Sequence, residues 1–386
     1  MSFSIGKVFG IKIKIHFTWF LIFALIAWTL AVFYLPSQFP GLSVTIYWII
    51  GTISALLLFV SVLVHELAHS YVAIKKGLPV SSITLYLFGG ISEIETEPSD
   101  AKTEAIVSVV GPLTSFAIAG ISAAAWFVVV AVGLGTAFEA PLFYIAVINI
   151  LLGAFNLLPA FPLDGGRLLR AAIWQWKKDL VPATKTATKI SKIFAYSIIG
   201  FGFFSILFIN FISGLWLVFI GWFLRNGADQ SLKQTIIMQA ISDLDVGQIM
   251  TKTVITVPPE KTISEAENEF FNIQKHGGFP VVKDNQIVGI ITRDDLKSIQ
   301  DYDKQKRRVE DIMTPRSKLI FLRPNESVAD AFMKFSKNNI GRMPVLEEET
   351  VVGIVTRSDV IRAVQVKTQE SSETKVEREK ISLEFS

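Results

Sequence analysis

The sequence contains no cysteine. Disulfide bonds are therefore impossible, and any metal site must use nitrogen and oxygen ligands. A large excess of charge of one sign is also lacking, because 37 Lys and Arg against 34 Asp and Glu leave a formal net charge of +3. This balance gives no electrostatic case for nucleic acid as a partner. The polar start, and the lack of a small-residue cleavage site after the first apolar run, argue against a cleavable signal peptide.

Long apolar runs are present, and nearly all of them precede about residue 225. A helix needs roughly 20 mostly apolar residues to cross a bilayer. By length and apolarity we predict six spans, at residues 17–35, 47–73, 105–132, 141–158, 193–209 and 211–224. The last two are short and are separated by little more than Asn210. We therefore expect residues 1–226 to form a helical membrane domain.

Lysine and arginine occur on alternate sides of these spans. They precede the first span, follow the second, are frequent between the fourth and fifth, and recur after the sixth at Arg225. The loop at residues 36–46 has none, and neither does the loop between the third and fourth spans. Since cytoplasmic loops carry the excess of positive residues, we expect a multi-pass protein of the cell membrane with both termini in the cytoplasm.

Two stretches of the membrane half have the pattern of strands. Residues 11–16 alternate isoleucine with lysine or histidine, which is the period of a β-strand. Residues 80–94 are rich in Ile, Thr, Leu, Tyr and Ser, and predict a strand pair or a re-entrant loop covered by protein near the membrane surface. His16 is a candidate metal ligand, but an interfacial residue on a strand is the expected role because it lacks helical spacing to a second ligand.

The motif His65-Glu66-Leu67-Ala68-His69 lies inside the second apolar run. On a helix, two histidines four residues apart share one face and can bind one metal ion, while Glu66 can act as a base on a water that the metal activates. Ionisable residues at membrane depth are costly and indicate function. A chance match on a polar helix face would leave three polar residues in lipid without a purpose, so the motif favours a metal site.

A catalytic zinc ion requires three protein ligands and a water, so two histidines are not enough. After the fourth span, residues 156–167 contain two prolines and two glycines that break the helix, and Asp164 is the only carboxylate in this break. Asp164 is a candidate third ligand. Asp before Gly-Gly is also common as an ordinary turn or helix cap, and the residues by themselves leave both roles open.

Taken together, these residues resemble the site-2 protease family of intramembrane zinc metalloproteases. The resemblance rests on residues 65–69, 111–115 and 156–167, and it covers about residues 1–226. It implies a zinc endopeptidase that cleaves transmembrane segments of membrane-protein substrates within the lipid bilayer. It further implies one catalytic Zn²⁺ bound by His65, His69 and Asp164, with Glu66 as the base, and with Asn156 holding the substrate backbone or stabilising the oxyanion.

A helical substrate must unwind before its peptide carbonyl can be attacked, because helical hydrogen bonds hide the carbonyl groups. An exposed edge of residues 80–94 could hold the unwound stretch by strand addition. Simple packing of this segment explains its composition equally well. The sequence offers no place for the PDZ domain that many members of the family carry.

After Gly227 the composition becomes that of a soluble α/β domain with an internal repeat. Residues 249–251, 279–282 and 288–295 recur as residues 312–314, 343–346 and 352–359, and each copy predicts the order strand, helix, strand, strand, helix. The repeats resemble a pair of CBS domains. We expect a linker at residues 227–245, CBS domains at 246–302 and 303–366, and a charged, disordered tail at 367–386. The expected fold is therefore a multi-span α-helical membrane protein with a small membrane-associated β element, followed by a soluble α/β CBS-domain pair.

The resemblance to CBS domains implies an adenine nucleotide such as ATP, ADP or AMP in the cleft between repeats. The residues at the matching positions are Thr292, Asp295, Thr356 and Asp359. The same Thr-x-x-Asp spacing is a helix-capping pattern, so capping alone remains an alternative. CBS pairs would also allow a homodimer.

Two rival functions follow from the same sequence. A CBS-regulated transporter or channel would need polar residues along a path across several spans, whereas the few polar residues here converge on the His-Glu-His and Asn-Asp motifs. A non-catalytic zinc-binding scaffold would have no use for Glu66. Both comparisons favour an enzyme.

Overall fold

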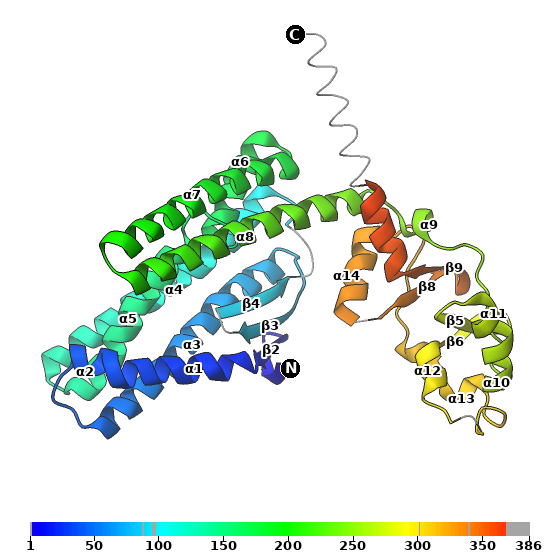
Figure 1. Ribbon diagram of the computed structural model, residues 1–386, viewed down its shortest axis with the longest axis horizontal. Coiled ribbons are helices and arrows are strands. Elements are labelled where there is room, and N and C mark those ends of the chain that lie inside the picture. The colour runs from blue at the N-terminus through cyan, green and yellow to red at the C-terminus, as the bar shows by residue number, and fades with distance from the viewer. Residues whose placement is uncertain (1, 87–88, 95–97, 301, 339, 368–386) are drawn as a thin grey trace, which may run out of the picture. The chain divides into compact units, whose positions relative to one another are not determined.

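The computed structural model describes residues 2–86, 89–94, 98–300, 302–338 and 340–367 (Figure 1). The chain divides into two compact units, Met1–Thr235 and Ile236–Ser386. The predicted linker at residues 227–245 includes the last part of a helix that ends at Ser242. Nearly all of the predicted tail, residues 368–386, lies outside the described residues.

Six helices of the described chain are long and apolar enough to cross a membrane, as predicted. The first combines α1 (Thr18–Thr29), η1 (Leu30–Tyr34) and α2 (Leu35–Gln38). The others are α3 (Val44–Lys75), α4 (Ala101–Val132), α5 (Thr136–Asn156), α7 (Leu180–Phe208) and α8 (Phe211–Ser242). A shorter helix, α6 (Asp164–Lys177), lies between α5 and α7 in the sequence.

The helices that carry the last two predicted spans are longer than those spans. Residues 193–209 cover only the second part of α7, and residues 211–224 cover only the first part of α8. Both helices continue through charged or polar sequence, such as Lys185 and Lys189 in α7. Apolarity marks the part of a helix that can lie in lipid, but the hydrogen-bonded helix itself extends beyond that part.

Local capping explains where the two central helices begin and end. The Ser43 hydroxyl accepts a hydrogen bond from the Ile46 N–H at 3.4 Å, and Asp100 Oδ1 accepts one from the Thr103 N–H at 2.9 Å. At the other end of α4, Gly133 adopts the left-handed conformation with φ of 72°, which glycine tolerates at a helix terminus. α4 packs against α3, α5 and α6, so these helices bring distant parts of the sequence together.

A four-stranded sheet accompanies the helices in the order β1 (Ser2–Val8), β2 (Ile11–His16), β3 (Val80–Tyr86), β4 (Gly89–Ile94). The predictions of a strand at 11–16 and of a strand pair within 80–94 are confirmed. β2 and β3 pair in parallel, and the other two pairings are antiparallel. The structure adds β1, whose residues are all exposed and therefore carry no alternation of burial. Among the described strands, β4 is an edge.

The second unit contains the two predicted repeats. In the first, α10 (Ile263–Ala266), η2 (Glu267–Phe271) and α11 (Asn272–Gln274) precede β5 (Gly278–Lys283), β6 (Gln286–Thr292) and α12 (Arg293–Lys297). In the second, α14 (Val328–Asn338) precedes β8 (Arg342–Glu347), β9 (Thr350–Thr356) and helical residues 357–367. The leading strand that we predicted in each copy is only an isolated bridge, Val257 to Val281 and Leu322 to Val345.

Residues near the start of each repeat pair with a strand of the other repeat. β7 (Thr314–Pro315), from the second repeat, pairs with β6 of the first, and Thr251 of the first repeat bridges to Ile354 in β9 of the second. Met313 and Met250 occupy the space beside Gly289 and Gly353, where a side chain on either glycine would collide with the methionine. The recurring Ile-Met-Thr sequence thus serves contact between repeats.

Candidate metal centre

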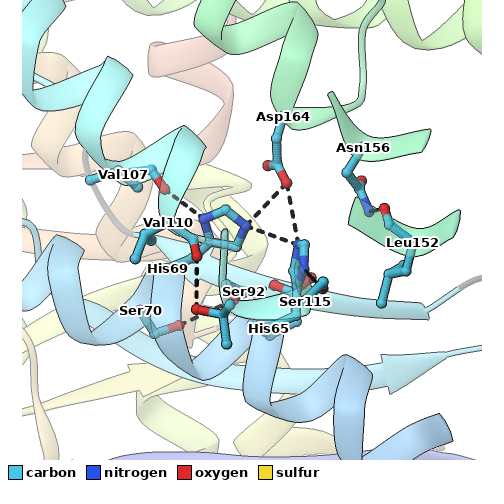
Figure 2. A network of polar contacts seen from close by, with 12 residues as sticks. His65, His69, Ser70, Ser92, Val107, Val110, Ser115, Leu152, Asn156 and Asp164 are labelled. Atoms are coloured by element: carbon cyan, nitrogen blue, oxygen red, sulfur yellow. Dashed lines mark hydrogen bonds and ion pairs between the residues drawn. The ribbon is translucent and has the colours of Figure 1, made fainter. Parts of the chain in front are cut away.

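His65, His69 and Asp164 converge in the structure (Figure 2). Asp164 Oδ2 lies 3.3 Å from His65 Nε2 and 3.1 Å from His69 Nε2, and the two Nε2 atoms are 3.1 Å apart. Both histidines are buried, and Asp164 is partly buried. Two imidazoles and one carboxylate are a donor set that zinc accepts at catalytic sites.

The elements that carry these residues explain the convergence. His65 and His69 are one turn apart on α3, and Asp164 is the first residue of α6, which follows the break after α5. The cap of α6 is Leu163, with no side-chain cap hydrogen bond, so Asp164 does not serve as an ordinary N-cap. Its side chain points toward the histidines instead (Figure 2).

Gly111 on α4 lies directly opposite the two histidines. A Cβ atom at this position would collide with the Nε2 atoms of both His65 and His69. The absence of a side chain therefore leaves room on the side toward which both ring nitrogens point. The sequence indicated residues 111–115 only through a family resemblance, and the structure gives this glycine a physical role in the site.

The other ring nitrogen of each histidine is held by α4. His69 Nδ1 donates to the Val107 carbonyl oxygen at 2.6 Å, and His65 Nδ1 lies 2.9 Å from the Ser115 hydroxyl oxygen. A carbonyl can only accept, so the proton of neutral His69 resides on Nδ1 and its Nε2 lone pair faces the cluster. Partners of this kind fix the tautomer and the ring orientation of metal-binding histidines. Sequence reasoning assigned no role to Val107 or Ser115.

Glu66 is held beside the cluster by the sheet. The Ser92 hydroxyl of β4 donates to Glu66 Oε2 at 2.6 Å, and the Ser70 hydroxyl donates to Ser92 Oγ at 3.2 Å. A Cβ on Gly90 would collide with Glu66 Cγ, so β4 lies directly against this side chain. Ser92 was not identified from the sequence, because nothing in its spacing relates it to the motif.

The carboxyl group of Asp164 is ionised at neutral pH. Burial raises its pKa, but the hydrogen bonds and the charge interactions with His65 and His69 together outweigh that effect and lower the pKa to about 2. The ionised form is the one that binds a metal ion.

Two further candidates from the sequence make no hydrogen bond to the cluster among the described residues. Asn156, at the end of α5, donates from Nδ2 to the Leu152 carbonyl oxygen at 2.9 Å (Figure 2). His16 Nδ1 lies 2.9 Å from the Thr18 hydroxyl oxygen, and His16 is not part of the potential metal-binding group. Its position on β2 agrees with the expected role on a strand.

The four residues predicted to bind nucleotide form capping contacts. Asp295 Oδ2 accepts from the Thr292 N–H at 2.8 Å and from the Thr292 hydroxyl at 2.7 Å. Asp359 Oδ2 accepts from the Thr356 N–H at 2.9 Å and from its hydroxyl at 2.7 Å. The capping alternative is therefore realised in both repeats, which does not prevent the same groups from meeting a ligand. A separate cavity of about 850 Å³ in the second unit is lined by none of the four.

Comparisons with known proteins agree with this division of the chain. The model of peptidase family M50 matches residues 53–139 and 131–200, and the CBS domain model matches residues 246–301 and 309–366. The protein named "putative zinc metalloprotease Rip3" of Mycobacterium tuberculosis is 31% identical over 95% of this chain and 93% of its own length. Zinc metalloprotease MJ0392 of Methanocaldococcus jannaschii is 30% identical over 95% of this chain and 97% of its own. The solved site-2 protease of the same archaeon is 31% identical over 60% of this chain and 95% of that chain, with a TM-score of 0.39.

The fold and the site define a multi-pass membrane metalloendopeptidase with a pair of CBS domains. The chain belongs to peptidase family M50, the zinc metalloproteases of the site-2 protease type. The predicted family and fold class are thereby confirmed, and this family is one of peptidases rather than of transporters or scaffolds.

Proposed function

We propose that the protein hydrolyses peptide bonds within transmembrane segments of membrane proteins, using one zinc ion held by His65, His69 and Asp164. The observation that carries this proposal is the convergence of His65 Nε2, His69 Nε2 and Asp164 Oδ2, which lie 3.1–3.3 Å from one another. The histidines lie on α3, a helix that is apolar enough to span a membrane. Bound zinc supplies Lewis-acid polarisation and an activated water at neutral pH.

Glu66 is the general base in this proposal. Ser92 holds Glu66 Oε2, so we assign proton transfer to Oε1. Glu66 takes the proton of the attacking water and returns it to the leaving amine. Asn156 would hold the substrate backbone or stabilise the oxyanion, which requires its amide to exchange the Leu152 carbonyl for the substrate.

The edge strand β4 is a candidate surface for the unwound substrate. It pairs with β3 on one side, and it carries Ser92 next to Glu66. A peptide added to its other side would gain backbone hydrogen bonds close to the proposed base. Packing against α3 remains the competing role of this strand.

Chelation tests the proposal. The purified full-length protein is incubated with a panel of single-span membrane proteins, with and without a zinc chelator. We expect the chelator to stop cleavage and added zinc to restore it. Cleavage that is indifferent to the chelator would exclude a zinc-dependent reaction.

We propose that both termini face the cytoplasm, from the distribution of Lys and Arg. Because the chain lacks cysteine, single cysteines can report the sidedness. We expect an impermeant thiol reagent to label Leu134→Cys in intact cells, and Lys76→Cys only after permeabilisation. The opposite pattern would invert the topology.

We propose that an adenine nucleotide binds the CBS pair through Thr292, Asp295, Thr356 and Asp359 and changes the rate of proteolysis. A carboxylate suits ribose hydroxyls, and a threonine hydroxyl suits phosphate. The physical link is α8, which continues without a break past the boundary at Thr235 and ends at Ser242. A ligand can change the rate only by binding one arrangement of the two units more tightly than another. The same pair of domains would also support a homodimer.

Calorimetry on the full-length protein with ATP, ADP, AMP and S-adenosylmethionine tests this regulation. We expect one of them to bind, and the double variant Asp295→Ala with Asp359→Ala to weaken that binding at least about tenfold, a loss of roughly 1.4 kcal/mol. The control is Asp294→Ala, which removes an exposed neighbouring carboxylate outside the capping pair. No binding at millimolar nucleotide would leave the Thr-x-x-Asp motifs as helix caps.

A further inference from the structure

A buried ion pair joins α4 and α6 outside the metal cluster. Arg170 Nε donates to Glu104 Oε1 at 2.8 Å, and Arg170 Nη2 donates to the same oxygen. Arg170 is 5% exposed and Glu104 is 0% exposed. Arg170 Nη1 also donates to the Thr235 hydroxyl on α8 at 3.1 Å, and Thr235 is 1% exposed. One guanidinium thus connects three helices.

Stability alone is a poor explanation for this arrangement. Glu104 Oε2 is buried and has no hydrogen-bond partner among the described residues. Buried ion pairs that leave polar atoms unsatisfied are often no more stable than apolar side chains of similar size. The geometry of the connection is therefore the more informative feature.

Arg170 is connected to the chain on both sides of Asp164. It lies further along α6, the helix that begins with Asp164, and its guanidinium carbon is 5.7 Å from the centre of the Phe161 ring in the segment just before Asp164. A Cβ on Gly166 would collide with the Phe161 backbone nitrogen, so the helix and this segment are in close contact. Arg170 is therefore in contact with the segment before Asp164 and belongs to the helix that begins with Asp164.

α8 follows the same segment along its length. Leu224 packs in one cluster with Leu163, and Ala228 packs in another with Phe161. Between them, a Cβ on Gly227 would collide with the Pro162 ring. Thr235 then adds the polar contact to Arg170. α8 therefore packs against the segment that precedes Asp164.

We propose that Arg170 is a positioning residue for the metal site and that Thr235 of α8, through Arg170, sets the place of Asp164. This inference rests on the proposed role of Asp164 as a metal ligand. According to this proposal, α8 influences the metal site through Arg170, although α8 carries none of the proposed ligands. Any displacement of α8 near Thr235 is then transmitted to the third ligand.

The test compares Thr235→Val with two other variants of the full-length protein. Thr235→Val replaces the hydroxyl with a methyl group of similar size, and Thr235→Ser keeps the hydroxyl. Thr188→Val is the matched control, because Thr188 is a buried threonine on α7 whose hydroxyl has no partner in the described part of the chain. Zinc affinity is measured by titrating metal-free protein against a competing chelator, and unfolding temperature is measured in parallel.

We expect Thr235→Val to weaken zinc binding about tenfold, the lower end of the loss seen when residues that support metal ligands are removed. We also expect it to lower kcat with little change in KM. Thr235→Ser should restore both, and Thr188→Val should leave both unchanged. A purely structural role would lower the unfolding temperature and leave zinc affinity unaltered, which would overturn the inference.

The same titration includes Asp164→Ala. If this variant loses zinc while Thr235→Val binds it like the wild type, the positioning role is wrong and the proposed ligand set stands. If Asp164→Ala retains tightly bound zinc, the ligand assignment fails and the positioning role fails with it.

Discussion

Glu66→Gln is expected to retain one zinc ion per chain and to lower the rate of peptide hydrolysis by about 10²–10⁴-fold, the range that a positioned general base contributes. Glutamine has nearly the same shape, and its amide oxygen can still accept the hydrogen bond from Ser92 that Glu66 Oε2 accepts at 2.6 Å. It cannot take up a proton from the attacking water. Metal analysis and a cleavage assay on the same preparation measure the two effects.

The matched control for this substitution is Glu93→Gln. Glu93 lies next to Ser92 on β4, and its Oε2 accepts from the Ser82 hydroxyl at 2.5 Å rather than facing the cluster. The same change of charge at nearly the same place should leave cleavage close to the wild-type rate. Full activity in Glu66→Gln would contradict the role of Glu66 as the base.

His65→Ala, His69→Ala and Asp164→Ala are each expected to weaken zinc binding at least about 100-fold. This is the upper end of the loss caused by removing residues that only support a ligand. Each variant removes one of three protein ligands from a site whose open position is meant for water. Metal content after purification and competition with a chelator measure the loss.

His16→Ala is the control for the histidine variants, because His16 hydrogen-bonds at Thr18 and lies outside the potential metal-binding group. It should bind zinc as the wild type does. The decisive variant is Asp164→Ala, since Asp164 alone of the three is not part of the helical motif. Stoichiometric, tightly held zinc in this variant would show that Asp164 is not a ligand.

The part of the site that the sequence predicts is the part that local geometry determines. His65 and His69 face the same way because a helix repeats every 3.6 residues, and an apolar run is enough to predict that helix. Asp164 is 95 residues from His69, so no spacing rule places it. Its position depends on how α3, α4 and α6 pack. The sequence made it a candidate only as the single carboxylate in a helix break, with a cap as the alternative, and the family resemblance favoured the ligand.

The residues to which sequence reasoning assigned no role all act across long separations. Ser92 reaches Glu66 through strand pairing, and Ser115 reaches His65 through the packing of α4 on α3. Gly111 is important because it lacks a side chain. The sequence cannot show this, because the collision that a Cβ atom would cause with both histidines depends on the packing of α4 against α3. The pairing of β7 from the second CBS repeat with β6 of the first is likewise a tertiary contact, and the sequence of one repeat alone does not predict it.

The central claim is that zinc-dependent hydrolysis takes place inside a transmembrane segment, and the position of the cleaved bond tests it most directly. Wild-type protein and Glu66→Gln are each reconstituted in liposomes with a single-span substrate, and the products are identified by mass spectrometry. We predict a cut between two residues of the apolar segment that is lost with a chelator and lost in Glu66→Gln. A cut confined to the soluble flanks, or one that persists in Glu66→Gln, would contradict the account.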